Sequence, residues 1–172
     1  MITRPTGLRT VRLVLCALVL FLLQVTISHR LTYGILHADL LYVLAAFLAL
    51  EASEEAALWS ALGIGLLRDL GSSGRLGGSA VLLVLGAAGL LHVRDRIFRE
   101  VFVTDMVLVF AFALFCGAGH ATGLAVAGRY AQWGALLAGA LGQALVTAVL
   151  YPVFAFLFER AALLDRAGSG RA

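Results

Sequence analysis

Hydrophobic residues run in long blocks along this chain, and the short stretches between the blocks hold most of the charges. A helix needs about 20 mostly apolar residues to cross the ~30 Å hydrocarbon core of a bilayer. Because a backbone in lipid must satisfy its own hydrogen bonds, each block is predicted to be a helix. The sequence predicts six such helices, at residues 13–27, 35–50, 56–67, 79–93, 101–126 and 133–158.

Two of these blocks, 35–50 and 56–67, are short for a full crossing, so five spans is an alternative to six. The block at 13–27 follows basic residues as a signal peptide does. No small-x-small cleavage site follows it, so we expect it to remain as the first helix. We expect one polytopic membrane domain over residues 1–172, with a cytoplasmic N-terminus at 1–12, six helices within 13–158 and a cytoplasmic tail at 159–172.

Composition supports a membrane protein, because 62% of the 172 residues are hydrophobic and 13% are charged. Soluble domains have roughly 45–50% apolar and about 25% charged residues. The 13 basic residues are all arginine, and with six spans nine of them fall on the side of the termini and four on the other. The positive-inside rule then places both termini in the cytoplasm, which predicts a multi-pass protein of the bacterial inner membrane. We read no nucleic-acid binding into this charge.

Candidate catalytic chemistry is sparse. The sequence has no Ser/His/Asp arrangement, no phosphate-binding loop and no paired intramembrane carboxylates. Cys16 and Cys116 stand apart inside apolar blocks, without the clustered ligands that a metal site needs. We therefore expect a non-enzymatic protein with no metal or cofactor.

Ionisable residues inside membrane segments are costly and are candidates for function. Asp39 opens the second block, where it is expected either to cap the helix or to contact a partner or ligand. Asp105 lies just inside the fifth block, where we expect a structural ion pair with Arg94, Arg96 or Arg99. Gln143 and Thr147 share a face of the sixth block and are candidates for hydrogen bonds to another helix.

The stretch at 61–80 joins the third and fourth blocks and carries an adjacent charged pair, Arg68 and Asp69. Neighbouring residues of a helix do not face each other, so each is expected to point elsewhere, with Arg75 as a partner for Asp69. The pair is predicted either to stabilise the end of a helix or to contact a partner. The candidate contact residues of this turn are Arg68, Asp69, Gly74, Gly77 and Gly78.

Small residues recur within the apolar blocks and predict where helices approach each other. Helices in lipid pack through such small faces, so Gly63 and Gly65 in the third block are candidate packing positions. Gly134 and Gly142 in the sixth block are candidates for the same reason. Pro152 is expected to kink the sixth helix.

These residues together resemble the MreD family of rod shape-determining membrane proteins. The resemblance rests on the glycine-rich stretch at 63–77, GIGLLRDLGSSGRLG, and on Asp39-Leu40, which opens the second block as Pro-Asp-Leu does in that family. Asp39 matches, whereas Ala38 stands in place of the proline. Chain length, number of helices and the basic stretch at 94–99 also fit.

The resemblance implies a non-enzymatic scaffold of the cell-elongation complex, which supports lateral peptidoglycan synthesis and cell shape. Its expected partner is an MreC-like protein with a single membrane span, with indirect links to MreB, RodA and a class B penicillin-binding protein. The family is similar in fold to the substrate-binding subunits of energy-coupling-factor transporters. A small-molecule-binding subunit of such a transporter is therefore the alternative, with a pocket near Asp39, Arg68 and Asp69.

Overall fold

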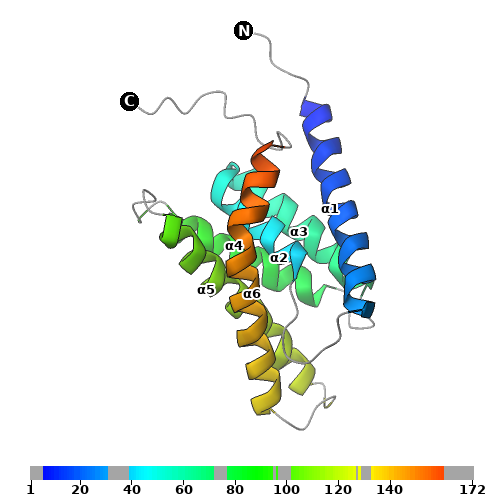
Figure 1. Ribbon diagram of the computed structural model, residues 1–172, viewed down its shortest axis with the longest axis vertical. Coiled ribbons are helices and arrows are strands. Elements are labelled where there is room, and N and C mark those ends of the chain that lie inside the picture. Colours follow the sequence, from blue (N-terminus) through cyan, green and yellow to red (C-terminus); the bar gives the residue numbers. More distant parts are fainter. Residues whose placement is uncertain are drawn as a thin grey trace.

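The computed structural model describes residues 6–30, 39–71, 77–94, 96, 102–126, 128 and 133–160, and all regular structure in these ranges is helical. Within these described ranges, six helices follow one another (Figure 1). They are α1 (Thr6–Arg30), α2 (Leu40–Glu51), α3 (Glu54–Gly71), α4 (Gly78–Arg94), α5 (Phe102–Val126) and α6 (Trp133–Arg160). Each of the six predicted apolar blocks contributes to one of these helices.

The boundaries differ from the prediction mainly at α2 and α3. Helix α2 begins at Leu40 rather than at residue 35, because the side chain of Asp39 caps it there. Helix α3 continues to Gly71 instead of ending at residue 67, and Arg68 and Asp69 lie at its C-terminal end. The 12 residues of α2 make a helix about 18 Å long, which is much shorter than the hydrocarbon core of a bilayer.

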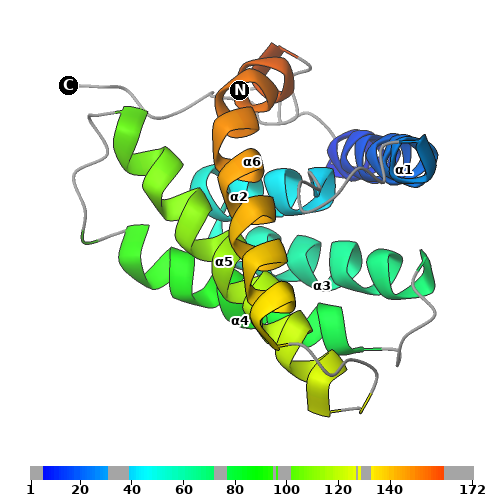
Figure 2. The same ribbon diagram turned by 60° about the horizontal axis from the view of Figure 1, so that its bottom comes forward.

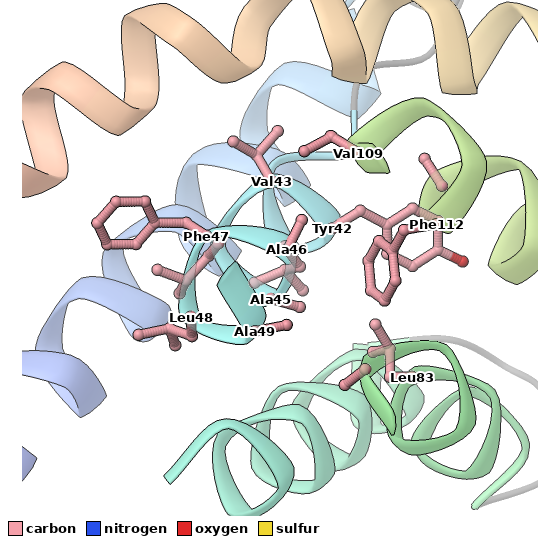
Figure 3. Close-up of a cluster of buried hydrophobic side chains, with 14 of the residues drawn as sticks. Tyr42, Val43, Ala45, Ala46, Phe47, Leu48, Ala49, Leu83, Val109 and Phe112 are labelled. Carbon is pink, nitrogen blue, oxygen red and sulfur yellow. The ribbon is translucent and has the colours of Figure 1, made fainter. Parts of the chain in front are cut away.

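Helix α2 forms the centre of the molecule. All residues from Leu40 to Leu50 are buried, on every side of the helix. Figure 3 shows side chains leaving α2 in several directions, with Phe112 and Val109 of α5 and Leu83 of α4 around them. A helix that is apolar all round belongs in a protein interior, and the other five helices supply that interior.

The remaining helices pack in two antiparallel pairs and one peripheral helix (Figure 2). Helix α3 packs along α4, and α5 packs along α6. Helix α1 contacts α2 and α3 at the edge of the bundle. Among the α1 side chains that the structure describes, only that of Leu20 is buried.

Within the described residues, two helices are long and apolar enough to cross a membrane. These are the segments Val103–Val126 of α5 and Trp133–Phe158 of α6. Shorter apolar stretches occur at Val14–Gln24, Leu40–Glu51 and Gly78–Arg94. Helix α6 continues through Pro152 to Arg160 as one element.

A polar cluster at the N-terminus of α2

Asp39 caps α2, which was one of its two expected roles. Its backbone is extended, with φ −101° and ψ 97°, and its carboxylate accepts hydrogen bonds from the amides of Leu41 and Tyr42. The distances from Oδ1 are 3.2 Å to the nitrogen of Leu41 and 3.4 Å to that of Tyr42. An N-cap carboxylate satisfies amides that have no partner within the helix and complements the positive end of the helix dipole. Asp39 itself is only 2% exposed.

The second oxygen of Asp39 binds side chains from two other helices. The Nε of Arg68, in α3, lies 3.0 Å from Oδ2 and forms an ion pair with it. The side-chain amide of Gln143, in α6, donates to the same oxygen at 3.3 Å. One buried carboxylate therefore joins α2, α3 and α6. The predicted hydrogen bond from Gln143 to another helix is present, whereas the hydroxyl of Thr147 donates to the Gln143 carbonyl of its own helix.

Arg68 makes two further contacts inside the bundle. Its Nη1 donates to the hydroxyl of Ser79, in α4, at 3.1 Å. Its guanidinium carbon lies 4.6 Å from the ring centroid of Tyr42, a distance at which a cation is attracted to the ring face. Tyr42 in turn meets the edge of Phe112 in α5, at 6.2 Å between ring centroids. Arg68 therefore ties the end of α3 to α2 and α4.

Asp69 points to a different part of the molecule from Arg68, as expected for adjacent residues of a helix. Its carboxylate accepts hydrogen bonds from the backbone amides of Gly77 at 2.8 Å, Ser79 at 3.1 Å and Ala80 at 3.4 Å. These amides belong to the start of α4, so Asp69 caps a helix from outside it. Arg75, its expected partner, lies outside the described residues.

The glycines of this turn differ in what they contribute. Gly77 has φ +98°, a conformation that favours glycine, and it places its amide on Asp69. Gly78 begins α4 on an exposed surface, and a Cβ added there would meet no described atom within 4 Å. Gly74 lies outside the described residues.

The predicted packing glycines divide into two groups. A Cβ added to Gly65 would come within 2.3 Å of the Ala80 Cα, so this glycine allows α3 and α4 to touch. A Cβ added to Gly63 or Gly134 would meet no described atom within 4 Å, and both glycines are exposed. Their expected packing role therefore stays a prediction, with no contact among the described residues that supports it. Gly142 is half-buried in α6.

The sequence reasoning missed Arg94 as a cap for α2. Its Nη1 donates to the carbonyls of Ala49 at 3.1 Å, Leu50 at 3.4 Å and Ala52 at 2.8 Å, at the C-terminal end of α2. A cation there complements the negative end of the helix dipole. The only signal was a basic residue following an apolar block. Asp105 lies half-buried in the first turn of α5.

The cluster of Asp39, Arg68, Gln143 and Ser79 is therefore an internal polar network. Among the described side chains, every buried polar nitrogen or oxygen has a hydrogen-bond partner. No group of three His, Cys, Asp or Glu side chains in the described ranges is arranged to hold a metal ion. The network joins the ends of α2, α3 and α4 to the middle of α6, and its charges balance within the Asp39–Arg68 pair.

In the part of the chain that the structure describes, fold and site define a helical protein with a buried polar network and with two helices long and apolar enough to cross a membrane. No family model, curated protein or solved structure matches the chain.

Proposed function

We propose that this chain is a multi-pass protein of the bacterial inner membrane in which all six helices form one membrane domain with cytoplasmic termini. The length and composition of α5 and α6 support membrane insertion, as does a mean hydropathy of +0.99. The outer face of α6 also supports it, because large apolar side chains lie exposed along it, among them Leu145, Val149, Val153 and Phe156. Such a face suits lipid better than water. The distribution of arginines supports the orientation.

The short α2 is compatible with this arrangement. A backbone end at membrane depth is tolerated where protein encloses it and satisfies its polar groups. Asp39 binds the free amides at one end of α2, and Arg94 binds the free carbonyls at the other. Helix α2 therefore does not need to reach either membrane surface itself.

We further propose that the protein is a non-enzymatic scaffold of the bacterial cell-elongation complex, acting as MreD-like proteins do. In this role it binds an MreC-like single-span protein and supports lateral peptidoglycan synthesis, with indirect links to MreB, RodA and a class B penicillin-binding protein. One observation carries the proposal beyond the resemblance. Asp39, Arg68 and Asp69, which carry that resemblance, bind other parts of the same bundle. They hold the helices of the bundle in place, as expected of a scaffold that acts by presenting a fixed surface to its partners.

The test is affinity purification from native membranes with a tag on the C-terminus. Recovery of a single-span protein with a β-rich periplasmic domain, together with wall synthases, is the expected result. Recovery of a pair of cytosolic ATPases with a coupling membrane subunit would instead establish the transporter alternative. Depletion of the protein should convert rod-shaped cells to spheres, and unchanged shape would contradict the proposal.

A variant pair separates a scaffold from a binding pocket. Arg68→Ala should reduce complex assembly only as far as it reduces the amount of folded protein, because Arg68 acts through α2 and α4. Leu70→Ala serves as the control, because Leu70 neighbours the cluster in sequence but is 73% exposed. Loss of assembly with Arg68→Ala at an unchanged amount of folded protein would show that Arg68 contacts a ligand or partner directly.

A further inference from the structure

A half-open groove of about 400 Å³ lies between α1, α2 and α3. Its walls include Val14 and Leu18 of α1, Leu44 of α2, and Trp59, Gly63 and Leu67 of α3. It is almost entirely apolar. Figure 2 shows α1 beside α2 and α3 at one edge of the bundle, where this groove lies.

The α3 wall of the groove combines three small residues, Ala56, Ser60 and Gly63, with the larger Trp59, Ile64 and Leu67. The small residues recur at helical spacing and form a strip about 10 Å long on one face of α3. At Gly63 the strip is open, since an added Cβ would meet no described atom within 4 Å. At Gly65, two residues further on, Ala80 occupies the space that a Cβ would need. Helix α3 thus carries one exposed and one buried glycine two residues apart, and among the described residues only the buried one contacts another helix.

Small residues favour a helix as the occupant of the groove. Helices associate in lipid where small side chains let the two backbones approach, whereas an acyl chain has no need of such a strip. Trp59, which is 72% exposed, borders the strip, and tryptophan is a common anchor in protein interfaces. The groove is too small for a whole helix, so a helix would lie along it and insert one row of side chains.

Charge at one end of the groove identifies the kind of helix. Helix α3 begins with Glu54 and Glu55, both exposed, directly before Ala56 in the groove wall. In the proposed orientation these acids are cytoplasmic. The positive-inside rule gives a single-span protein an excess of Lys and Arg at its cytoplasmic flank. Such a flank would meet Glu54 and Glu55 when its helix occupies the groove.

A second apolar groove, of about 250 Å³, lies between α4 and α5 and provides a comparison. Gly89 in its wall is also exposed, and an added Cβ there would meet no described atom within 4 Å. Arg94 follows Val93 of its wall, and its guanidinium binds the carbonyls at the C-terminal end of α2. The described residues that line this groove include no counterpart of Glu54 and Glu55, so only the first groove offers a basic flank an acidic pair at its end.

We propose that the groove between α1 and α3 receives the membrane-spanning helix of a single-span partner whose basic cytoplasmic flank binds Glu54 and Glu55. This inference rests on the proposed function, which supplies the MreC-like protein as that partner.

The test uses the full chain co-expressed with a tagged MreC-like protein from the same genome. Gly63→Leu fills the proposed groove, and Gly89→Leu makes the same change in the other groove. We expect Gly63→Leu to lower co-purification at least tenfold at an unchanged amount of folded protein, and Gly89→Leu to leave it unaltered. Normal retention of the partner by Gly63→Leu, or its loss with Gly89→Leu, would overturn the inference. Failure of the unchanged chain to retain the partner would overturn the proposed function as well.

Two further measurements test the occupant. Glu54→Arg with Glu55→Arg should lower co-purification, and replacing the basic flank of the partner by glutamates should restore it. An absence of rescue would contradict the charge argument. A photo-cross-linking amino acid in place of Trp59 should join the partner, whereas one in place of the exposed Val107 of α5 should not. A lipid adduct alone at position 59 would assign the groove to an acyl chain and overturn the inference.

Discussion

The ion pair between Arg68 and Asp39 should contribute strongly to stability, and a double-mutant cycle measures its contribution. The perturbations are Arg68→Ala, Asp39→Asn and the two together. Asparagine keeps an oxygen in place to accept from the amides of Leu41 and Tyr42, so it removes the charge while retaining the cap. The cycle thereby separates the ion pair from the capping role of Asp39.

The magnitude follows from the geometry. Two charges 3.0 Å apart attract each other by about 5 kcal/mol at an effective dielectric constant of about 20, and desolvation offsets part of this. The Asp39 side chain is 3% exposed and that of Arg68 17%, so loss of the arginine leaves the more deeply buried charge without its cation. We expect Arg68→Ala to lower the free energy of unfolding by about 3–4 kcal/mol and Asp39→Asn by about 2 kcal/mol. The double variant should cost little more than Arg68→Ala, which gives a coupling energy of about 2 kcal/mol.

The assay is equilibrium unfolding in mild micelles, followed by circular dichroism as a denaturing detergent is added. A coupling energy below about 0.5 kcal/mol would refute the reasoning, because distant, independent residues give values of that size. The exchanged variant, Asp39→Arg with Arg68→Asp, supplies a second check. It should remain destabilised, because an arginine at position 39 cannot accept the two α2 amides. Full recovery in the exchanged variant would show that Asp39 acts through its charge alone.

Three further predictions concern single positions. Gly65→Ala should lower the free energy of unfolding by about 1–3 kcal/mol, because the added Cβ pushes α3 away from Ala80. Gly63→Ala should leave the free energy of unfolding unchanged or raise it by up to about 1 kcal/mol. The same unfolding assay compares the two variants, and equal effects would contradict the assigned contacts. Asp69→Ala removes the cap of α4 and should lower the free energy of unfolding by about 1–2 kcal/mol, and Asp69→Asn should lower it less. Hydrogen exchange at the amides of Ser79 and Ala80 should accelerate in Asp69→Ala. Arg94→Gln should cost about 1.5–3 kcal/mol and accelerate exchange in the last turn of α2; unchanged exchange there would exclude the capping role.

The sequence predicted the helices well and their interactions poorly. Apolar blocks located all six helices, because hydrophobic length is a property of each block by itself. The start of α2 was predicted five residues too early, because only the capping geometry of Asp39 marks where the helix begins. Capping by Asp39 was foreseen because it depends on the next two or three amides alone.

Contacts between distant residues were not predictable from this pattern. Arg68 reaches Asp39 across 29 positions and Gln143 reaches it across 104, and no local rule relates them. The sequences of α5 and α6 did not indicate which face of each helix points inward either. Apolar residues occur on all sides of both helices, so no polar side marks the exterior. Gly63 and Gly65 could not be distinguished either, because a glycine has no side chain whose polarity marks a face, although one is exposed and the other touches α4.

Two arginines hold the central helix at its opposite ends, and this arrangement separates stability from the proposed binding surface. Arg68 fixes the N-terminus of α2 from α3, and Arg94 fixes its C-terminus from α4. Gly63 lies five residues before Arg68, about 140° away around α3, so the two residues point to different sides of the helix. The hydrogen bonds of Arg68 among the described residues involve Asp39 and Ser79 and not Gly63, so the effects of changes at Gly63 and at the cluster should add. Gly63→Leu should lower partner binding equally in the unchanged chain and in Asp39→Asn, per folded molecule. A binding defect that depends on the Asp39 background would mean that the groove and the cluster form one site.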